Sequence, residues 1–170
     1  ISIDDMPERH DEVRQIKGLF ENCIDTYKRL KKINNVSPVV SITVTQENCD
    51  NIEKIFNFLH YDSKIDSIKC TLVRDEGVYK TPLDKKNKIL AAYNWLTNTI
   101  EKLSNNKSLI NYNSESLQGR LHRKKDYISW KMIKEMYITP KYISMCYAGK
   151  LFGIIAANGS VYPCEILENK

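Results

Sequence analysis

The sequence predicts an α/β fold built on parallel strands, either an open sheet or a segment of a β/α barrel. Three observations lead to this prediction. Segments with the three-and-four spacing of amphipathic helices alternate with short runs rich in β-branched residues, the connections are short, and the order strand, helix, strand repeats. Because such units are joined by right-handed crossovers, we expect consecutive strands to be parallel.

The first predicted elements are a strand remnant at 1–4, a proline-containing loop at 5–9 and one helix over 10–33. Lysines and Arg29 gather in the last turns of this helix, as the helix dipole favours. Its predicted apolar face consists of Val13, Ile16, Phe20, Ile24, Tyr27 and Leu30.

Two strands with a helix between them follow. Residues 39–45 are dense in β-branched side chains, as a buried strand requires, and Asn48 is placed to cap a second helix. In the strand predicted over 65–73, alternate side chains share a face. The apolar face of that strand consists of Ile68, Cys70 and Leu72.

The second half of the chain begins with a helix after Pro82 and a polar stretch at 104–116, predicted to be a loop. The region 117–136 is again helical in pattern. An Asn-Gly pair between the apolar runs 151–157 and 161–164 then predicts a β-hairpin.

Composition places the chain among globular cytoplasmic proteins of one-domain size. It has 170 residues, of which 42% are apolar and 28% charged, and it contains no secretion signal or apolar run of the roughly 20 residues that span a bilayer. The net charge of +5 is spread along the chain, so no nucleic acid partner is expected. One basic cluster, at 120–125, is either a solvated helix face or a contact for phosphates or an acidic partner.

Two of the five cysteines lie on either side of the predicted hairpin. An odd number of cysteines in a chain without a signal argues against a disulfide framework. The hairpin can bring the thiols of Cys146 and Cys164 to one metal, since thiolates bind zinc and iron-sulfur clusters. Zinc, a cluster and two unrelated core cysteines all remain open on this evidence. For Cys23, Cys49 and Cys70 we predict core positions.

The spacing around this hairpin resembles a known family. Cys146 is followed by twelve residues, Gly159, four residues and Cys164, and 161–165 read Val-Tyr-Pro-Cys-Glu. This pattern resembles the opening of the SPASM and twitch domains of radical SAM enzymes. The resemblance implies that Cys146 and Cys164 are ligands of an auxiliary [4Fe-4S] cluster, whose other cysteines would lie beyond residue 170.

The start of the chain resembles the fourth barrel strand and following helix of the same family. The similar segments are Ser2-Ile3-Asp4-Asp5, then His10-Asp11-Glu12-Val13-Arg14, then Gly18-Leu19-Phe20. Asp5 stands where the family usually has glycine, which reduces the conformational freedom of the loop. The apolar first residue, with no initiator methionine, is typical of a sequence that begins inside a strand, so we expect a preceding segment.

The resemblance also implies where S-adenosylmethionine (SAM) would bind. Active sites of barrels collect at the carboxyl ends of the strands. Ser2 and Asp4 would face the SAM ribose or amino-acid portion there, and Arg14 would reach the SAM carboxylate, brace the loop or form only a helix-face ion pair. The remaining residues that the resemblance places around the SAM and substrate cavity are Thr45, Asn48 and Arg74.

The Cys-x3-Cys-x2-Cys motif that binds the SAM cluster in this family does not occur in these residues. The resemblance therefore implies part of an enzyme: 1–139 as the C-terminal half of a partial, TIM-like β/α barrel, and 140–170 as the start of a SPASM-like domain. A half barrel is expected to expose unpaired strand edges and an apolar inner face.

For the intact parent, the resemblance implies reductive SAM cleavage at a [4Fe-4S] cluster and hydrogen abstraction by the 5′-deoxyadenosyl radical. The implied partners are SAM, a peptide or small-molecule substrate and an electron donor such as flavodoxin or ferredoxin, with no membrane. Two alternatives from other classes remain: a non-catalytic binding module, and a small zinc-binding protein.

Overall fold

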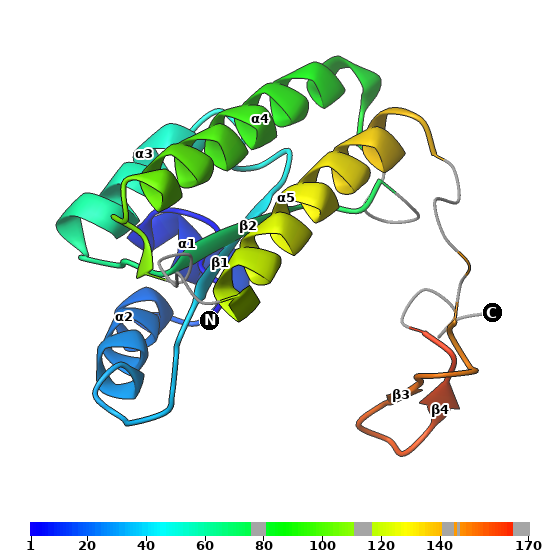
Figure 1. The fold of residues 1–170 in the computed structure, drawn as a ribbon, viewed down its shortest axis with the longest axis horizontal. Coiled ribbons are helices and arrows are strands. Elements are labelled where there is room, and N and C mark those ends of the chain that lie inside the picture. Colours follow the sequence, from blue (N-terminus) through cyan, green and yellow to red (C-terminus); the bar gives the residue numbers. More distant parts are fainter. Residues whose placement is uncertain (76–80, 111–116, 141–144, 146, 165–170) are drawn as a thin grey trace. The chain divides into compact units, whose positions relative to one another are not determined.

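We describe the fold from a computed structural model of the chain (Figure 1). The structure describes residues 1–75, 81–110, 117–140, 145 and 147–164. The chain forms two compact units, Ile1–Ile138 and Thr139–Lys170. The sequence placed the domain boundary at 139/140.

The centre of the first unit is a parallel sheet. Strands β1 (Val40–Val44) and β2 (Ile68–Leu72) pair in parallel from Val40↔Ile68 to Val44↔Leu72. The start of the chain joins the free edge of β1, because the Ile3 N–H donates to the Ser41 carbonyl at 3.1 Å and Ser2 forms a parallel bridge with Ser41. The strands predicted at 39–45 and 65–73 and their parallel order are confirmed as β1 and β2, whereas the strand remnant predicted at 1–4 forms only an isolated bridge.

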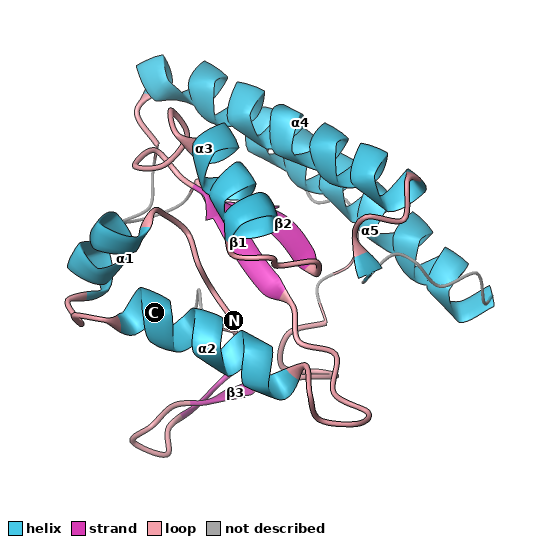
Figure 2. Cartoon of the chain, turned by 90° about the vertical axis from the view of Figure 1, so that its left-hand side faces the viewer, coloured by secondary structure: helices cyan, strands magenta, loops and turns pink. Residues whose placement is uncertain are grey.

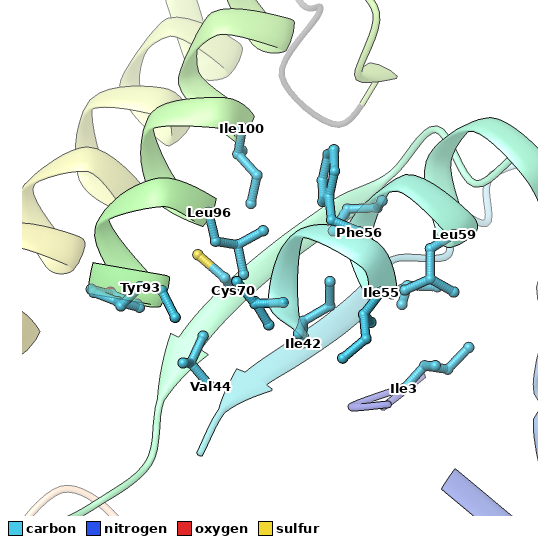
Figure 3. Packing of buried hydrophobic residues seen from close by; sticks show 14 of the residues in the cluster. Ile3, Ile42, Val44, Ile55, Phe56, Leu59, Cys70, Tyr93, Leu96 and Ile100 are labelled. Carbon is cyan, nitrogen blue, oxygen red and sulfur yellow. The ribbon is translucent and has the colours of Figure 1, made fainter. Parts of the chain in front are cut away.

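The two faces of this sheet differ in chemistry. On one face the apolar side chains of both strands are buried and meet the helices, as Figure 3 shows for Ile42, Val44 and Cys70. The alternate positions carry Ser41, Thr43, Lys69 and Thr71, of which Lys69 is exposed and the others half-buried. The expectation of an exposed apolar inner face is therefore wrong: the face opposite the core carries hydroxyl groups and a lysine.

The single helix expected over 10–33 is two helices. Helix α1 (Pro7–Arg14) begins inside the segment predicted to be a loop, with proline at its first position, and α2 spans Leu19–Leu30. Between them Gln15 and Gly18 have φ values of 55° and 77°, which no helix can continue through. The Asp11 carboxylate accepts the Gly18 and Phe20 N–H groups and so closes the start of α2.

Helix α3 (Ile52–Asn57) continues into a single π-helical turn, η1 (Phe58–Asp62). The prediction that Asn48 caps this helix is wrong, because Asn51 occupies the N-cap position and no side chain caps there. The Asn48 side chain points instead to the sheet, as described below. Figure 2 shows α3 beside the two strands.

Two long helices complete the first unit. Helix α4 (Leu83–Asn105) confirms the helix expected after Pro82 and takes up the first two residues of the predicted 104–116 loop. Helix α5 (Leu117–Ile138) confirms the helical pattern at 117–136. The core lies between the sheet and the helices, where β1 and β2 side chains meet those of α3 and α4, including Ile55, Phe56, Tyr93, Leu96 and Ile100 (Figure 3).

The second unit contains the predicted hairpin in shorter form. Strands β3 (Ile154–Ile155) and β4 (Val161–Tyr162) are antiparallel, and Gly159 in the turn has a φ of 83°. Most of the hairpin side chains are exposed, among them Leu151, Ile155 and Val161. None of the helices in the described parts of the chain has the length and apolar character to cross a membrane.

Candidate functional site at the carboxyl edge of the sheet

Asp4 links three segments at the edge where the parallel strands end. Its Oδ1 accepts the Thr43 N–H at 2.7 Å, and its Oδ2 accepts a hydrogen bond from Arg14 Nη2 at 2.8 Å. Asp4 follows the first strand segment, Thr43 lies in β1 and Arg14 ends α1. One carboxylate thus ties the strand edge to the helix that follows it, and both of its oxygens have partners.

Asn48 completes this network from the loop after β1. Its Oδ1 accepts the Thr45 N–H at 2.8 Å, and its Nδ2 donates to the Asp4 carbonyl at 2.7 Å and to the Thr43 carbonyl at 2.8 Å. Asn48 is only 2% exposed. Because both amide protons and the carbonyl oxygen are used by the backbone, Asn48 positions the strand ends and has no donor left for a ligand.

Arg14 is the member of the network with donor capacity to spare. Its side chain is 45% exposed, whereas that of its partner Asp4 is 24% exposed. A guanidinium has five N–H donors, and Asp4 takes one of them. Arg14 can therefore present further donors to an anionic group at this edge while Asp4 fixes its position.

The other three residues of the expected site are Ser2, Thr45 and Arg74. Thr45 joins the network only through its backbone N–H, and the structure shows no side-chain contact of Ser2 or Arg74 with it among the described residues. Thr45 Oγ1 accepts the Glu47 N–H at 3.2 Å, Ser2 is exposed on the strand segment before Asp4, and Arg74 follows β2 and is exposed. The structure thus brings four expected residues, Asp4, Arg14, Thr45 and Asn48, into one hydrogen-bonded group.

Two further polar residues near this group are buried, which the sequence did not indicate. Asp5 is 8% exposed, its φ is not positive, and its Oδ1 accepts the Met6 N–H at 2.8 Å. The loop therefore accommodates aspartate where the resembled family has glycine. His10 is 2% exposed, its ring meets the Phe20 ring edge-on, and its Nε2 has no hydrogen-bond partner among the residues that the structure describes.

Burial lowers the pKa of His10, and the nearby Arg14 lowers it further, although Asp4, Asp11 and Asp5 oppose this shift. The lowered pKa favours the neutral imidazole at neutral pH. His10 belongs to the motif His10-Asp11-Glu12-Val13-Arg14 that carries the family resemblance, but helical periodicity alone does not separate it from an ordinary core residue.

The metal site expected in the second unit is described only in part. Cys146 lies outside the described residues, and Cys164, after β4, is a half-buried free thiol. Across the residues that the structure describes, no three His, Cys, Asp or Glu side chains come together to hold a metal ion. Of the two expected ligands only Cys164 lies among the described residues, so these residues do not form a cluster site by themselves.

Of the remaining cysteines, Cys49 and Cys70 are buried, as expected for core positions, and Cys23 is half-buried. Burial raises the pKa of the Cys49 and Cys23 thiols, and of the Cys70 thiol most strongly. These groups therefore stay protonated and inert at neutral pH.

One comparison relates the chain to a characterised protein. A stretch of 55 residues, 32% of this chain, is 34% identical to the sporulation killing factor maturation protein SkfB of Bacillus subtilis (strain 168), a radical SAM enzyme, and covers 13% of that protein. No protein-family profile matches the chain, and no solved structure matches it. This similarity supports a radical SAM-related role in general terms, because it is confined to one stretch of 55 residues.

Proposed function

We propose that this chain is part of a radical SAM enzyme, with the Asp4–Arg14–Asn48 network as the wall of a SAM-binding site at the carboxyl edge of a partial β/α barrel. The observation that carries the proposal is that four residues chosen from the motif resemblance form one hydrogen-bonded group. The similarity to SkfB supports the same family.

Within this proposal the residues have different tasks. Arg14 would bind the SAM carboxylate with the donors that Asp4 leaves free, and Asp4 and Asn48 would be positioning residues, because their polar atoms are already engaged. Ser2, Thr45 and Arg74 are proposed to line the cavity. When bound, SAM supplies the 5′-deoxyadenosyl radical that abstracts a hydrogen atom from a peptide or small-molecule substrate.

The second unit is proposed to begin a SPASM-like domain, with Cys146 and Cys164 as cysteines of its auxiliary cluster. The two thiols would need partners from outside the described residues, since no set of three ligands occurs within them. An electron donor such as flavodoxin or ferredoxin belongs to the same proposal.

The test uses the product of the complete reading frame that contains residues 1–170. We expect an in-frame Cys-x3-Cys-x2-Cys upstream and, after anaerobic reconstitution with iron and sulfide, formation of 5′-deoxyadenosine from SAM. An Arg14→Gln variant should raise the KM for SAM by about tenfold, the loss of one charge-assisted contact worth roughly 1.5 kcal/mol.

The matched control is Arg29→Gln, because Arg29 also pairs with an aspartate on a helix surface, Asp25 at 3.9 Å, but lies on α2 away from the network. This variant should leave the KM unchanged. If the complete product has no such motif and forms no 5′-deoxyadenosine, the proposal is wrong.

A further inference from the structure

Helix α5 carries a row of basic side chains along one side. Arg120, Lys124, Tyr127, Lys131 and Lys134 follow one another at alternating spacings of four and three residues, which places them on one side of a helix. Arg120, Lys124 and Lys131 are exposed, and Lys134 is half-buried. This basic row extends the cluster at 120–125 over about four helical turns, roughly 20 Å.

The charges of the basic row are largely uncompensated within the described residues. Arg120, Lys124 and Lys134 take part in no ion pair there, and the Lys131 ammonium lies 4.6 Å from the centroid of the Tyr127 ring. The carboxylate of Asp126 is engaged elsewhere, by Lys125 at 2.8 Å and His122 at 3.6 Å.

Glu135 is the other acid of α5. It lies one turn from Lys131 but three turns from Lys124 and four from Arg120, so Arg120 and Lys124 are the charges of the row that it is too far away to compensate. Like charges along a helix repel one another, so the row costs stability when it has no partner.

An exposed apolar row runs beside the basic one. Leu117, Leu121 and Ile128, spaced by four and seven residues, are 66%, 60% and 54% exposed. They do not belong to the core contact of α5, which is made by Trp130, Ile133 and Tyr137. Helix α5 therefore buries one side in the first unit and presents basic and apolar rows on another.

We propose that this side of α5, the basic row together with Leu121 and Ile128, is a docking surface for an acidic protein segment. Carboxylates of the partner would pair with the basic row, and its apolar side chains would cover Leu121 and Ile128. The exposed aliphatic side chains favour a protein partner over a nucleic acid, because aliphatic groups do not stack with bases, and the one ring of the row, Tyr127, is half-buried beneath the Lys131 ammonium. This surface shares no residue with the proposed SAM site.

The test measures binding of labelled peptides to the full 170-residue chain by fluorescence anisotropy. The first probe is a helical peptide of about 18 residues with glutamates on one side and leucines beside them. The second replaces the leucines by serine, and the third is an oligothymidylate of similar length. We expect the glutamate–leucine peptide to bind most tightly, and its affinity to fall with added salt.

Substitutions on α5 test whether the peptides bind at the proposed docking surface. The charge reversal Arg120→Glu, Lys124→Glu, Lys131→Glu should weaken peptide binding by at least about tenfold, since several charge pairs are lost together. Leu121→Ser with Ile128→Ser should weaken binding of the leucine peptide and leave the serine peptide unaffected. All substituted positions are exposed, so the fold should persist, as checked by circular dichroism.

The control reversal is Lys28→Glu, Lys32→Glu, Lys102→Glu, which changes the net charge equally at exposed positions on other segments. Equal weakening by this control would show nonspecific attraction and would overturn the proposal. Tighter binding of the oligothymidylate than of the glutamate–leucine peptide, lost in the α5 reversal, would identify a nucleic-acid surface and would overturn it as well.

Discussion

Asn48 is the residue on which the geometry of the strand ends depends most. Its side chain is buried and satisfies the Asp4 and Thr43 carbonyls and the Thr45 N–H. We expect Asn48→Ala to lower the free energy of unfolding by about 2–4 kcal/mol, because buried backbone groups lose their partners. Urea titration followed by circular dichroism measures this. Asn22→Ala, at an exposed position of α2, should change stability by no more than about 0.5 kcal/mol, and equal effects of the two variants would contradict the assignment.

His10 makes the stability of the chain depend on pH. Its pKa in the folded state is lowered from 6.5 by burial, so the unfolded state binds the proton more readily. Stability is therefore full above the unfolded pKa and is lost as the pH falls below about 6.5. Unfolding at pH 7.5 and 5.5 should show a loss that disappears in His10→Phe, which keeps a ring against Phe20. The exposed His122→Asn variant should keep the loss, and an unchanged pH dependence in His10→Phe would rule the mechanism out.

At the scale of single residues, only part of the candidate site could be predicted from the sequence. The motif resemblance pointed to Asp4, Arg14, Thr45 and Asn48, but their contacts depend on the parallel pairing of residues 1–3 with β1, which no local pattern contains. The role of Asn48 was predicted wrongly for this reason. Asparagine before a helix is usually a cap, but the Asn48 side chain donates instead to the distant carbonyl of Asp4 and to the nearby carbonyl of Thr43.

At the scale of elements, periodicity predicted β1, β2, α4 and α5, whose apolar side chains recur with the spacing of their own structure. It failed between α1 and α2. Val13 and Ile16 continue the apolar spacing of α2, so the pattern ran across the break, yet they are 55% and 54% exposed. Gly18 and the capping carboxylate of Asp11 were the signals of a new helix start.

The junction between α1 and α2 gives a test of this explanation. Gly18 has a φ of 77°, and a Cβ added there would meet no atom within 4 Å. Gly18→Ala should therefore destabilise the chain through backbone strain alone, by about 1–2 kcal/mol. Gly18→Asn should cost less, because asparagine tolerates this conformation better. Equal losses in thermal or urea unfolding would indicate a steric cause and contradict the backbone explanation.

At the scale of the whole molecule, the buried apolar cluster of the described residues lies in the first unit. Its members run from Ile3 to Tyr137, and none of the described residues of the second unit belongs to it. Tyr137 closes the cluster near the end of α5, where it is 5% exposed and its hydroxyl donates to Thr81 Oγ1 at 3.0 Å. The Lys86 ammonium lies 5.5 Å from the centroid of its ring. The stability of the first unit should thus depend on the chain up to Tyr137.

Two truncations separated by five residues test this dependence. A chain ending at Thr139 keeps every member of the cluster and should lie within about 1 kcal/mol of the full chain in its free energy of unfolding. A chain ending at Lys134 loses Tyr137 and should be destabilised by about 3 kcal/mol, the usual cost of removing a buried aromatic side chain. Leu96→Ala, at a fully buried position of α4, is the reference for the loss of one core side chain. It should lower the free energy of unfolding by about 2–5 kcal/mol in both the full chain and the chain ending at Thr139. If the chain ending at Thr139 were as unstable as the chain ending at Lys134, the second unit would contribute to the stability of the first, and the two would have to be treated as one cooperative structure.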